Sequence, residues 1–256
     1  RDRSEAVTRV LVLLPTRELA SQCVAVLQML SRYTPVRHAL VIGGLSLAAQ
    51  EAELRTRPDV VVATPGRLVD LLRNSRAVDL DDLEILVLDE ADRLLDMGFR
   101  EEVSEVLRQC PVRRQTLLFS ATLQGSVAEL ARVSLERPVR ISADPLFDVS
   151  KRLVQEFVRV RSGNQKDREA VLLSLVGRTF RRGVLVFCGR KAQAHRLAIL
   201  LGLRGVRAGE LHGSLPQRQR LEALEAFRTG AVDALVATDV AARGLDIAGV
   251  QAVVNF

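Results

Sequence analysis

The chain has 256 residues, of which 48% are hydrophobic and 27% charged, so it has the composition of a globular protein with room for two domains. No apolar run approaches the roughly 20 residues that cross a bilayer, so a membrane protein is not expected. No basic-then-apolar leader opens the chain, although it starts without Met and an upstream targeting segment could precede it. Cys23, Cys110 and Cys188 form no C-x-x-C pair, which argues against a zinc site or a disulfide framework and favours a reducing compartment.

The net charge of +6 is unevenly distributed along the chain. Residues 1–144 hold 19 Arg and Lys against 21 Asp and Glu, whereas residues 145–256 hold 18 against 10. Nearly all of the positive charge is arginine. This pattern fits a polyanionic partner of the second half, because guanidinium groups pair well with phosphate, although genomic base composition can produce the same bias.

Short apolar runs alternate with helical patterns in the first half of the chain. The predicted strands are Val10–Leu14, Ala39–Ile42, Val60–Ala63, Ile85–Leu88, Leu117–Phe119 and Val139–Ile141. The predicted helices are Glu18–Leu30, Arg67–Leu72, Glu101–Arg108 and Val127–Leu135. Strands that are apolar throughout indicate a parallel sheet covered by helices on both faces.

The periodicity breaks after Ser142, and we interpret residues 145–151 as a linker between domains at residues 1–144 and 152–256. In the second domain the predicted strands are Leu153–Val160, Val184–Phe187, Ala234–Ala237 and Ala252–Val254. The predicted helices are Asp167–Leu175, Ala192–Leu201 and Gln217–Phe227. The expected fold is α/β, with two tandem domains that are each a doubly wound, mostly parallel sheet.

Polar residues follow directly on several strand ends. They are Pro15-Thr16-Arg17, Thr64-Pro65-Gly66-Arg67, Asp89-Glu90, Ser120-Ala121-Thr122, Gly189-Arg190 and Thr238-Asp239. In open parallel sheets the carboxyl ends of the strands carry the site. We therefore expect functional groups at one rim of each domain, and an interdomain cleft where the two rims meet.

An apolar strand, Ile85–Leu88, ends in two acids, Asp89 and Glu90. The first carboxylate can hold the hydrated Mg²⁺ that bridges ATP phosphates, and the second can orient and deprotonate the attacking water. The competing interpretation is a polar cap at the start of a helix. The complete run from Leu88 to Phe99, L-D-E-A-D-R-L-L-D-M-G-F, closely resembles the signature of the DEAD-box ATP-dependent RNA helicases, which have two RecA-like domains.

The resemblance extends over nearly the whole chain and implies an RNA-binding surface. Its RNA-binding residues, by resemblance, are Pro15, Thr16, Arg17, Gly43, Gly44, Thr64, Pro65, Gly66, Arg67, Arg220, Thr238 and Asp239. The residue types also make physical sense, because Thr64 can cap a helix that starts at Pro65. The free N–H groups of that helix and Arg67 would bind phosphate without reading bases. Thr-Pro-Gly taken alone is only a turn.

The resemblance also implies the catalytic set. It comprises Asp89, Glu90, Asp92, Ser120 and Thr122, with Asp89 and Glu90 as Mg²⁺ ligands mainly through water and Gly244 and Asp246 near the nucleotide. The hydroxyls of Ser120 and Thr122 would tie the acids to the interdomain machinery, although Thr122 could instead cap a helix. Arg190 departs from the small polar residue of many members, so its role is open. His212, in a turn, is expected to be structural.

Two elements of the family are absent from the 256 residues. No lysine follows a glycine, so there is no G-x-x-x-x-G-K-S/T phosphate loop, and no His-Arg-x-Gly-Arg motif is present. We expect the first domain to lack its first strand and this loop, and the second domain to lack its carboxyl-terminal end. An arginine finger alone contributes about 10³–10⁵ in rate, so we expect negligible ATP hydrolysis by these residues on their own.

The leading interpretation is an ATP- and Mg²⁺-dependent RNA helicase that binds RNA backbone and unwinds short duplexes by domain closure. Two segments, Gln155 to Arg161 and Val253 to Phe256, resemble the nucleolar branch of the family, which acts in large-ribosomal-subunit assembly. This resemblance implies pre-ribosomal RNA and assembly proteins as partners. It also implies a nuclear, nucleolar location, or otherwise a cytoplasmic one. We expect a monomer with no membrane contact. The alternatives are a non-hydrolysing RNA-binding module and a DNA translocase.

Overall fold

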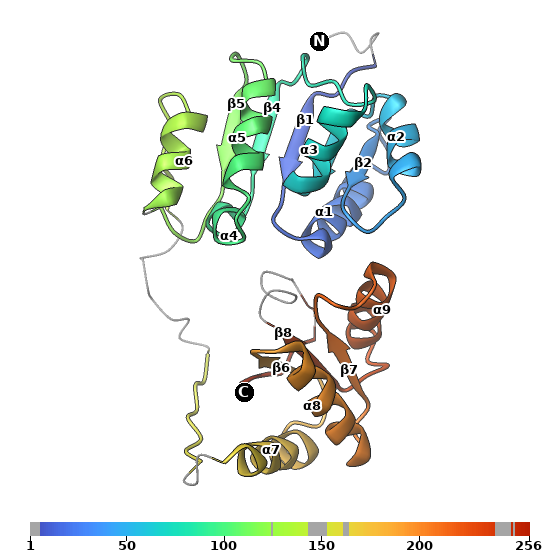
Figure 1. The fold of residues 1–256 in the computed structure, drawn as a ribbon, viewed down its shortest axis with the longest axis vertical. Helices are drawn as coiled ribbons and strands as arrows, with labels where there is room; N and C mark the ends of the chain where they lie inside the picture. The colour runs from blue at the N-terminus through green and yellow to red at the C-terminus, as the bar shows by residue number, and fades with distance from the viewer. Residues whose placement is uncertain (1–5, 124, 143–152, 161–163, 239–246, 248) are drawn as a thin grey trace. The chain divides into compact units, whose positions relative to one another are not determined.

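The computed structural model describes residues 6–123, 125–142, 153–160, 164–238, 247 and 249–256 (Figure 1). The chain divides into two compact units, Arg1–Arg137 and Pro138–Phe256. The predicted linker at residues 145–151 lies outside the described residues, so the domain boundaries at residues 144 and 152 stay a prediction.

The first unit is built on a five-stranded sheet with the order β2-β3-β1-β4-β5. Its elements are β1 (Val10–Leu13), α1 (Arg17–Leu30), β2 (His38–Val41), α2 (Leu47–Arg55), β3 (Val60–Ala63), α3 (Pro65–Asn74), β4 (Ile85–Leu88), α4 (Ala91–Asp96), α5 (Arg100–Gln109), β5 (Gln115–Leu118) and α6 (Ser126–Ser134). All of its strand pairs are parallel. The predicted parallel sheet is confirmed.

Helices cover this sheet on both faces. Successive side chains of a strand point to opposite faces, so Leu11 and Leu13 pack into one apolar cluster and Val10 and Val12 into another. The first cluster includes residues of α2, α3, α5 and α6, and the second includes residues of α1. Figure 1 shows α3 and α5 in front of the sheet and α1 behind it. Burial on both faces explains why the strands are apolar throughout.

The second unit repeats this architecture with four parallel strands in the order β7-β8-β6-β9. Its elements are α7 (Gln165–Ser174), a π-helical turn (Leu175–Thr179), β6 (Val184–Cys188), α8 (Lys191–Leu203), β7 (Ala208–Leu211), α9 (Gln217–Arg228), β8 (Ala234–Thr238) and β9 (Ala252–Asn255). The helices α7 and α8 pack on one face and α9 on the other.

Within the described residues, no helix is long and apolar enough to cross a membrane.

Two strand predictions are wrong. Neither Val139–Ile141 nor Leu153–Val160 forms a strand, and neither pairs with a strand among the described residues. The side chains of Val139, Ile141 and Phe157 are 87%, 86% and 96% exposed. An apolar run becomes a strand only where a neighbouring strand accepts its backbone hydrogen bonds and a core buries its side chains, and these runs have neither.

Candidate functional site

The carboxyl ends of all five strands of the first unit lie at one edge of the sheet, which we call the first carboxyl rim. The parallel register aligns Leu13 with Ala63 and Leu88 on its two neighbours, and these in turn with Val41 and Leu118. The segments implied in RNA binding follow β1, β2 and β3. The acids and the Ser-Ala-Thr segment follow β4 and β5. The segments expected to bind RNA therefore lie on one side of the rim and the expected catalytic residues on the other. The two sides adjoin where β1 pairs with β4.

The two acids of the rim are held in a defined geometry at the end of β4. The N–H of Asp89 donates to the carbonyl of Leu13 at 3.0 Å, which extends the ladder between β1 and β4 one residue beyond β4. Oδ1 of Asp89 accepts from the N–H of Glu90 at 2.9 Å. Glu90 has φ 51° and ψ 49°, a left-handed conformation that costs a non-glycine residue about 1–2 kcal/mol. Such strain at a loop that follows a strand is typical of functional sites.

Ser120 links the segment after β5 to the start of α4. Its Oγ accepts from the N–H of Asp92 and from the N–H of Thr122, each at 3.3 Å. The N–H of Ala91 donates to the carbonyl of Phe119 at 3.0 Å. Glu90 occupies the N-cap position of α4 without a side-chain cap bond, so neither acid acts as the cap. The capping explanation of this acid pair is therefore not supported, and the acids are left for other chemistry.

Burial raises the pKa of Glu90, and the charges of Asp89 and Asp92 raise it further, whereas the guanidinium of Arg93 lowers it. Nε of Arg93 lies 3.4 Å from Oε2 of Glu90. A carboxylate with a raised pKa is a stronger base, which suits proton abstraction from water.

The acid pair fits a hydrated Mg²⁺. Asp89 and Glu90 are both partly exposed, and no hydrogen bond among the described residues engages Oδ2 of Asp89 or either carboxylate oxygen of Glu90, so hard oxygen donors remain for a cation. No group of three or more His, Cys, Asp or Glu among those residues is arranged to hold a metal. Mg²⁺ is commonly bound by one or two carboxylates together with water and substrate phosphates, so two acids suffice.

On the other side of the rim, Arg17 and Gly43 are in close approach. Thr16 is the N-cap of α1, and its hydroxyl accepts from the N–H of Leu19 at 3.3 Å. Arg17 begins the helix, and a Cβ added to Gly43 would lie 2.8 Å from Nη2 of Arg17. Glycine at position 43 therefore lets the arginine lie against the loop after β2. The structure brings together two of the segments that the resemblance placed on RNA.

The loop after β2 is fastened by a residue that the sequence analysis did not identify. Gln50 of α2 is 4% exposed, and its Oε1 accepts from the N–H of Ile42 at 2.9 Å. Its Nε2 lies 3.4 Å from the carbonyl of Leu45 and 3.3 Å from that of Ser46. One side chain thus spans both ends of the loop that contains Gly43 and Gly44.

Arg67 connects the third segment to the same loop. Its Nη1 donates to the carbonyl of Leu45 at 3.2 Å. Thr64 is the N-cap residue and Pro65 the first residue of α3, as predicted, but the hydroxyl of Thr64 makes no cap bond. The first N–H groups of α3, with Gly66 exposed beside them, remain available to an anion.

In the second unit only part of the expected site is described. Cys188 and Thr238 are paired at the ends of β6 and β8, so Gly189 and Arg190 lie beside Thr238 at the carboxyl rim of this sheet. Arg220 lies on α9, the helix that covers β7 and β8. Asp239, Gly244 and Asp246 lie outside the described residues. His212 is buried in the turn after β7, with Nε2 3.7 Å from Oε2 of Glu210.

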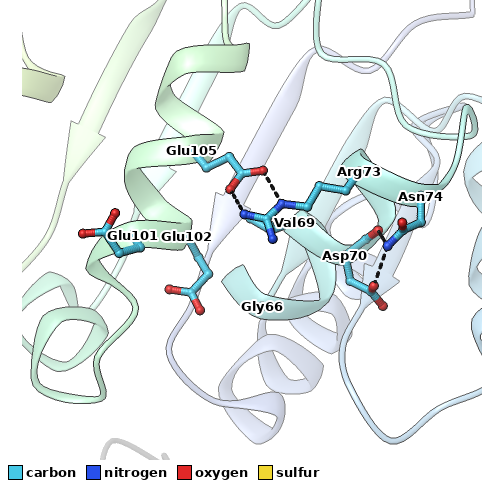
Figure 2. A pocket seen from close by; sticks show the side chains of 8 residues that line it. All are labelled: Gly66, Val69, Asp70, Arg73, Asn74, Glu101, Glu102 and Glu105. Atoms are coloured by element: carbon cyan, nitrogen blue, oxygen red, sulfur yellow. Dashed lines mark hydrogen bonds and ion pairs between the residues drawn. The ribbon is translucent and has the colours of Figure 1, made fainter.

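A hollow of about 260 Å³ lies between α3 and α5 (Figure 2). Figure 2 shows Arg73 paired with Glu105 and Asn74 bonded to Asp70. Nε of Arg73 lies 2.8 Å from Oε1 of Glu105. Glu101 and Glu102 also line it, and Gly66 is the only one of the expected site residues that does. Four acids against one arginine would repel phosphate, so the hollow is not the nucleotide or RNA site.

Two parallel α/β units, each with polar segments at its carboxyl rim, and an acid pair following a central strand of the first, define the RecA-like class of nucleotide-dependent proteins. The structure of Saccharomyces cerevisiae Dbp5 bound to RNA and ADP BeF3 matches the whole chain and 64% of its own, with a TM-score of 0.86 and 29% identity. A DEAD/DEAH box helicase model matches residues 2–130, and a helicase conserved C-terminal domain model matches residues 167–256.

These matches place the chain in the DEAD/DEAH box helicase family. Among its relatives are DEAD-box ATP-dependent RNA helicase 28 of Arabidopsis thaliana, 56% identical, and the probable ATP-dependent RNA helicase DDX27 of Homo sapiens, 52% identical. ATP-dependent RNA helicase DRS1 of Mycosarcoma maydis is 50% identical. Each match covers 100% of this chain but only 32%, 34% and 31% of the relative, so the chain spans about a third of their length.

Proposed function

We propose that the intact protein is an ATP-dependent RNA helicase that binds RNA through its backbone and separates short duplexes by ATP-driven domain closure. The observation that carries the proposal is the shared first carboxyl rim. There the strained acid pair after β4 adjoins the fastened segments after β1, β2 and β3. The names of the relatives, which are ATP-dependent RNA helicases, support it.

The residues of the first carboxyl rim have two roles, RNA binding and ATP hydrolysis. The N-terminus of α3 and the guanidinium groups of Arg17 and Arg67 bind RNA phosphates, and the loop of Gly43 and Gly44 contacts the same RNA strand. Contacts of this kind carry no base identity, so little sequence preference is expected. Glu90 accepts a proton from the attacking water, and Asp89 orients the metal's water shell. Mg²⁺, when bound, neutralises charge on the phosphate oxygens.

The finer assignments rest on resemblance. The resemblance of residues 155–161 and 253–256 to the nucleolar branch of the family supports a role in ribosome biogenesis, with pre-ribosomal RNA as substrate, assembly proteins as partners and a nucleolar location. Asp92, Ser120 and Thr122 are proposed to couple the acids to domain closure, with Gly244 and Asp246 at the nucleotide and Arg220, Thr238 and Asp239 on RNA. We propose that the protein acts as a monomer.

The alternatives are less well supported. A non-hydrolysing RNA-binding module would not need the raised pKa and strained backbone of Glu90. For a DNA translocase, single-stranded DNA would displace bound RNA, whereas we expect RNA to be displaced only by RNA.

The test is Glu90→Gln in the intact protein. This change keeps the shape of the side chain but removes the base, so ATP-dependent RNA binding should persist while turnover falls to background. Glu136→Gln, at an exposed position of the same unit, is the matched control and should leave both unchanged. Normal turnover by Glu90→Gln would refute the assigned base.

A further inference from the structure

Five exposed arginines gather at the amino-terminal edge of the second sheet, opposite to its carboxyl rim. Arg178, Arg181 and Arg182 precede β6, and Arg204 and Arg207 precede β7. We call these five residues the arginine edge.

The strand register places these loops at the same edge, on either side of the segment that precedes β8. Val184 of β6 and Ala208 of β7 are both paired with Ala234 of β8, so the residues just before β6 and β7 lie at the same edge, two strand spacings of about 4.8 Å apart, with Asp233 between them. Asp233, which precedes β8, accepts from Nε and Nη2 of Arg207 at 2.9 and 2.7 Å. The pKa of Asp233 is lowered mainly by this hydrogen bond and also by the charge of Arg182, which therefore lies within electrostatic reach.

One acid does not neutralise the edge. Asp233 is occupied by Arg207, and no hydrogen bond or ion pair within the described residues engages the other four guanidinium groups. The edge therefore presents an excess of positive charge to solvent, with fork-shaped donors that match phosphate oxygens.

The corresponding edge of the first sheet carries acidic residues among its basic ones. In sheet order, the residues just before its strands are Arg37, Asp59, Arg9, Glu84 and Arg114, so basic and acidic groups alternate. Arg9 lies 3.3 Å from Asp59 and 4.0 Å from Glu84, and the N–H of Arg37 donates to Asp59 at 3.0 Å. Arg9 and Arg37 thus have an acidic partner at the first edge, whereas four of the five arginines at the second edge form no ion pair among the described residues.

The loops that carry the arginines are held by backbone bonds. Gly183, with φ 63°, closely approaches the carbonyl of Gly249, and its own carbonyl accepts from the N–H of Gln251 at 2.8 Å. The turn after α8 is closed by the N–H of Val206, which donates to Leu201 at 3.0 Å. A ligand that binds the edge would not have to order the backbone, which lowers the entropic cost of binding.

We propose that the arginine edge is a second RNA-backbone site, which holds RNA that extends beyond the segment bound at the carboxyl rims. The proposal rests on the proposed helicase function for its choice of polyanion. The five residues of β6 separate the two edges of the sheet by about 17 Å, so a short strand confined to the carboxyl rim does not reach the arginines. The edge thus adds affinity for long or flanking RNA without reading sequence.

The experiment compares two fourfold variants of the intact protein that lose the same charge. The edge variant carries Arg178→Gln, Arg181→Gln, Arg182→Gln and Arg204→Gln, and leaves the Arg207 pair intact. The control variant carries Arg76→Gln, Arg108→Gln, Arg113→Gln and Arg132→Gln, all exposed in the first unit. Affinity is measured against salt for a short single strand, limited to the core, and for the same strand extended by a flanking segment.

The edge variant should bind the extended RNA more weakly. The slope of its log affinity against log salt should be reduced by up to about 0.7 for each phosphate that the protein no longer neutralises, or roughly 3 in all. The edge variant should bind the short strand as the parent does, and the control variant should behave as the parent with both. Asp233→Asn, which releases Arg207, should tighten binding of the extended RNA.

Equal losses for short and extended RNA, or edge and control variants that behave alike, would overturn the proposal. A variant that binds RNA normally but loses an acidic protein partner would also overturn it, in favour of a protein-docking surface. Failure of the helicase function is distinguishable, because the parent protein would then show no ATP-dependent binding even of the short strand.

Discussion

The side-chain carbonyl of Gln50 accepts a hydrogen bond from the backbone N–H of Ile42 at 2.9 Å, and this contact fixes where the loop of Gly43 and Gly44 leaves β2. The amide of the same side chain donates to the carbonyls of Leu45 and Ser46 at the far end of the loop. Gln50 is buried, so we expect it to act on the loop and not on RNA directly.

Gln50→Met in the intact protein should therefore weaken RNA binding. The change keeps the volume of the side chain but leaves the N–H of Ile42 unsatisfied, which costs about 1–3 kcal/mol of the free energy of unfolding. The loop loses its fixed position, so the Kd for RNA should rise several-fold while kcat at saturating RNA stays near that of the parent. Gln50→Glu keeps an acceptor but not the donors, and its Kd for RNA should lie between those of the parent and Gln50→Met.

The control is Leu54→Ala on the same helix. Leu54 is 3% exposed, and its truncation should cost about 2–5 kcal/mol of stability without touching the loop's hydrogen bonds. RNA affinity measured below the melting transition should be unchanged. If Leu54→Ala raised the Kd as much as Gln50→Met, the effect would come from stability alone.

Ser120→Ala should uncouple ATP hydrolysis from duplex separation. The change removes the oxygen that accepts from both Asp92 and Thr122. Asp89 and Glu90 keep their own hydrogen bonds, so nucleotide affinity should persist. The measurement is the number of base pairs separated per ATP hydrolysed by the intact protein. Ser120→Thr retains a hydroxyl and should recover most of the coupling, whereas equal losses in both variants would contradict this role.

Much of the fold was predictable because its strands are buried on both faces. The apolar runs at β1, β3 and β4 can bury their side chains only inside a parallel sheet that helices cover on both faces. The polar groups that follow these strands then lie at one rim. By contrast β7, with the sequence A-G-E-L, has no apolar run and was not predicted. It is a strand because β8 supplies its hydrogen bonds, which no local pattern encodes.

The missed part of the site has the same origin. The helix α2 was not predicted because its apolar periodicity is weak, and so the role of Gln50 was not predicted either. The partners of Gln50 at residues 42 to 46 depend on how α2 packs back against the loop. A glutamine in a polar helix normally faces solvent. Only its position shortly after a Gly-Gly loop hints at a tethering role, and that hint does not distinguish burial from exposure.

The rate of ATP hydrolysis by the intact protein should fall as the pH is lowered through the raised pKa of Glu90. Burial is the main cause of that raised pKa, and the charge of Arg93 opposes it. Only the ionised carboxylate can accept a proton, so kcat is lost on the acidic side. Arg93→Met should raise the pKa of Glu90 further and move the acidic limb of the kcat profile to higher pH. Arg93→Lys keeps the charge and should leave the limb close to its original position, and identical shifts in both variants would contradict the electrostatic explanation.

The same shift predicts a cost in stability. Because the pKa of Glu90 is higher in the folded than in the unfolded state, its contribution to stability is present below the unfolded pKa and is lost as the pH rises through the folded one. At neutral pH the ionised Glu90 should therefore destabilise the fold, and Glu90→Gln should melt at a higher Tm than the parent. At a pH below both pKa values the two proteins should melt together. A lower Tm for Glu90→Gln at neutral pH would show that the carboxylate stabilises the fold.

The thiol of Cys23 should report on the charge of Asp89. Burial raises the pKa of Cys23, and the negative charge of Asp89 raises it further. Since the thiolate is the reactive form, Asp89→Asn should lower this pKa and speed alkylation of Cys23 at fixed pH, measured by mass spectrometry of the peptide. Asp92→Asn removes an equal charge that does not act on Cys23, and should leave the rate unchanged. Cys110, which is 7% exposed with a pKa raised to about 11 by burial, should stay unlabelled in the parent and both variants. Equal rates for Cys23 in the two variants would show that Asp89 does not set the reactivity of this thiol.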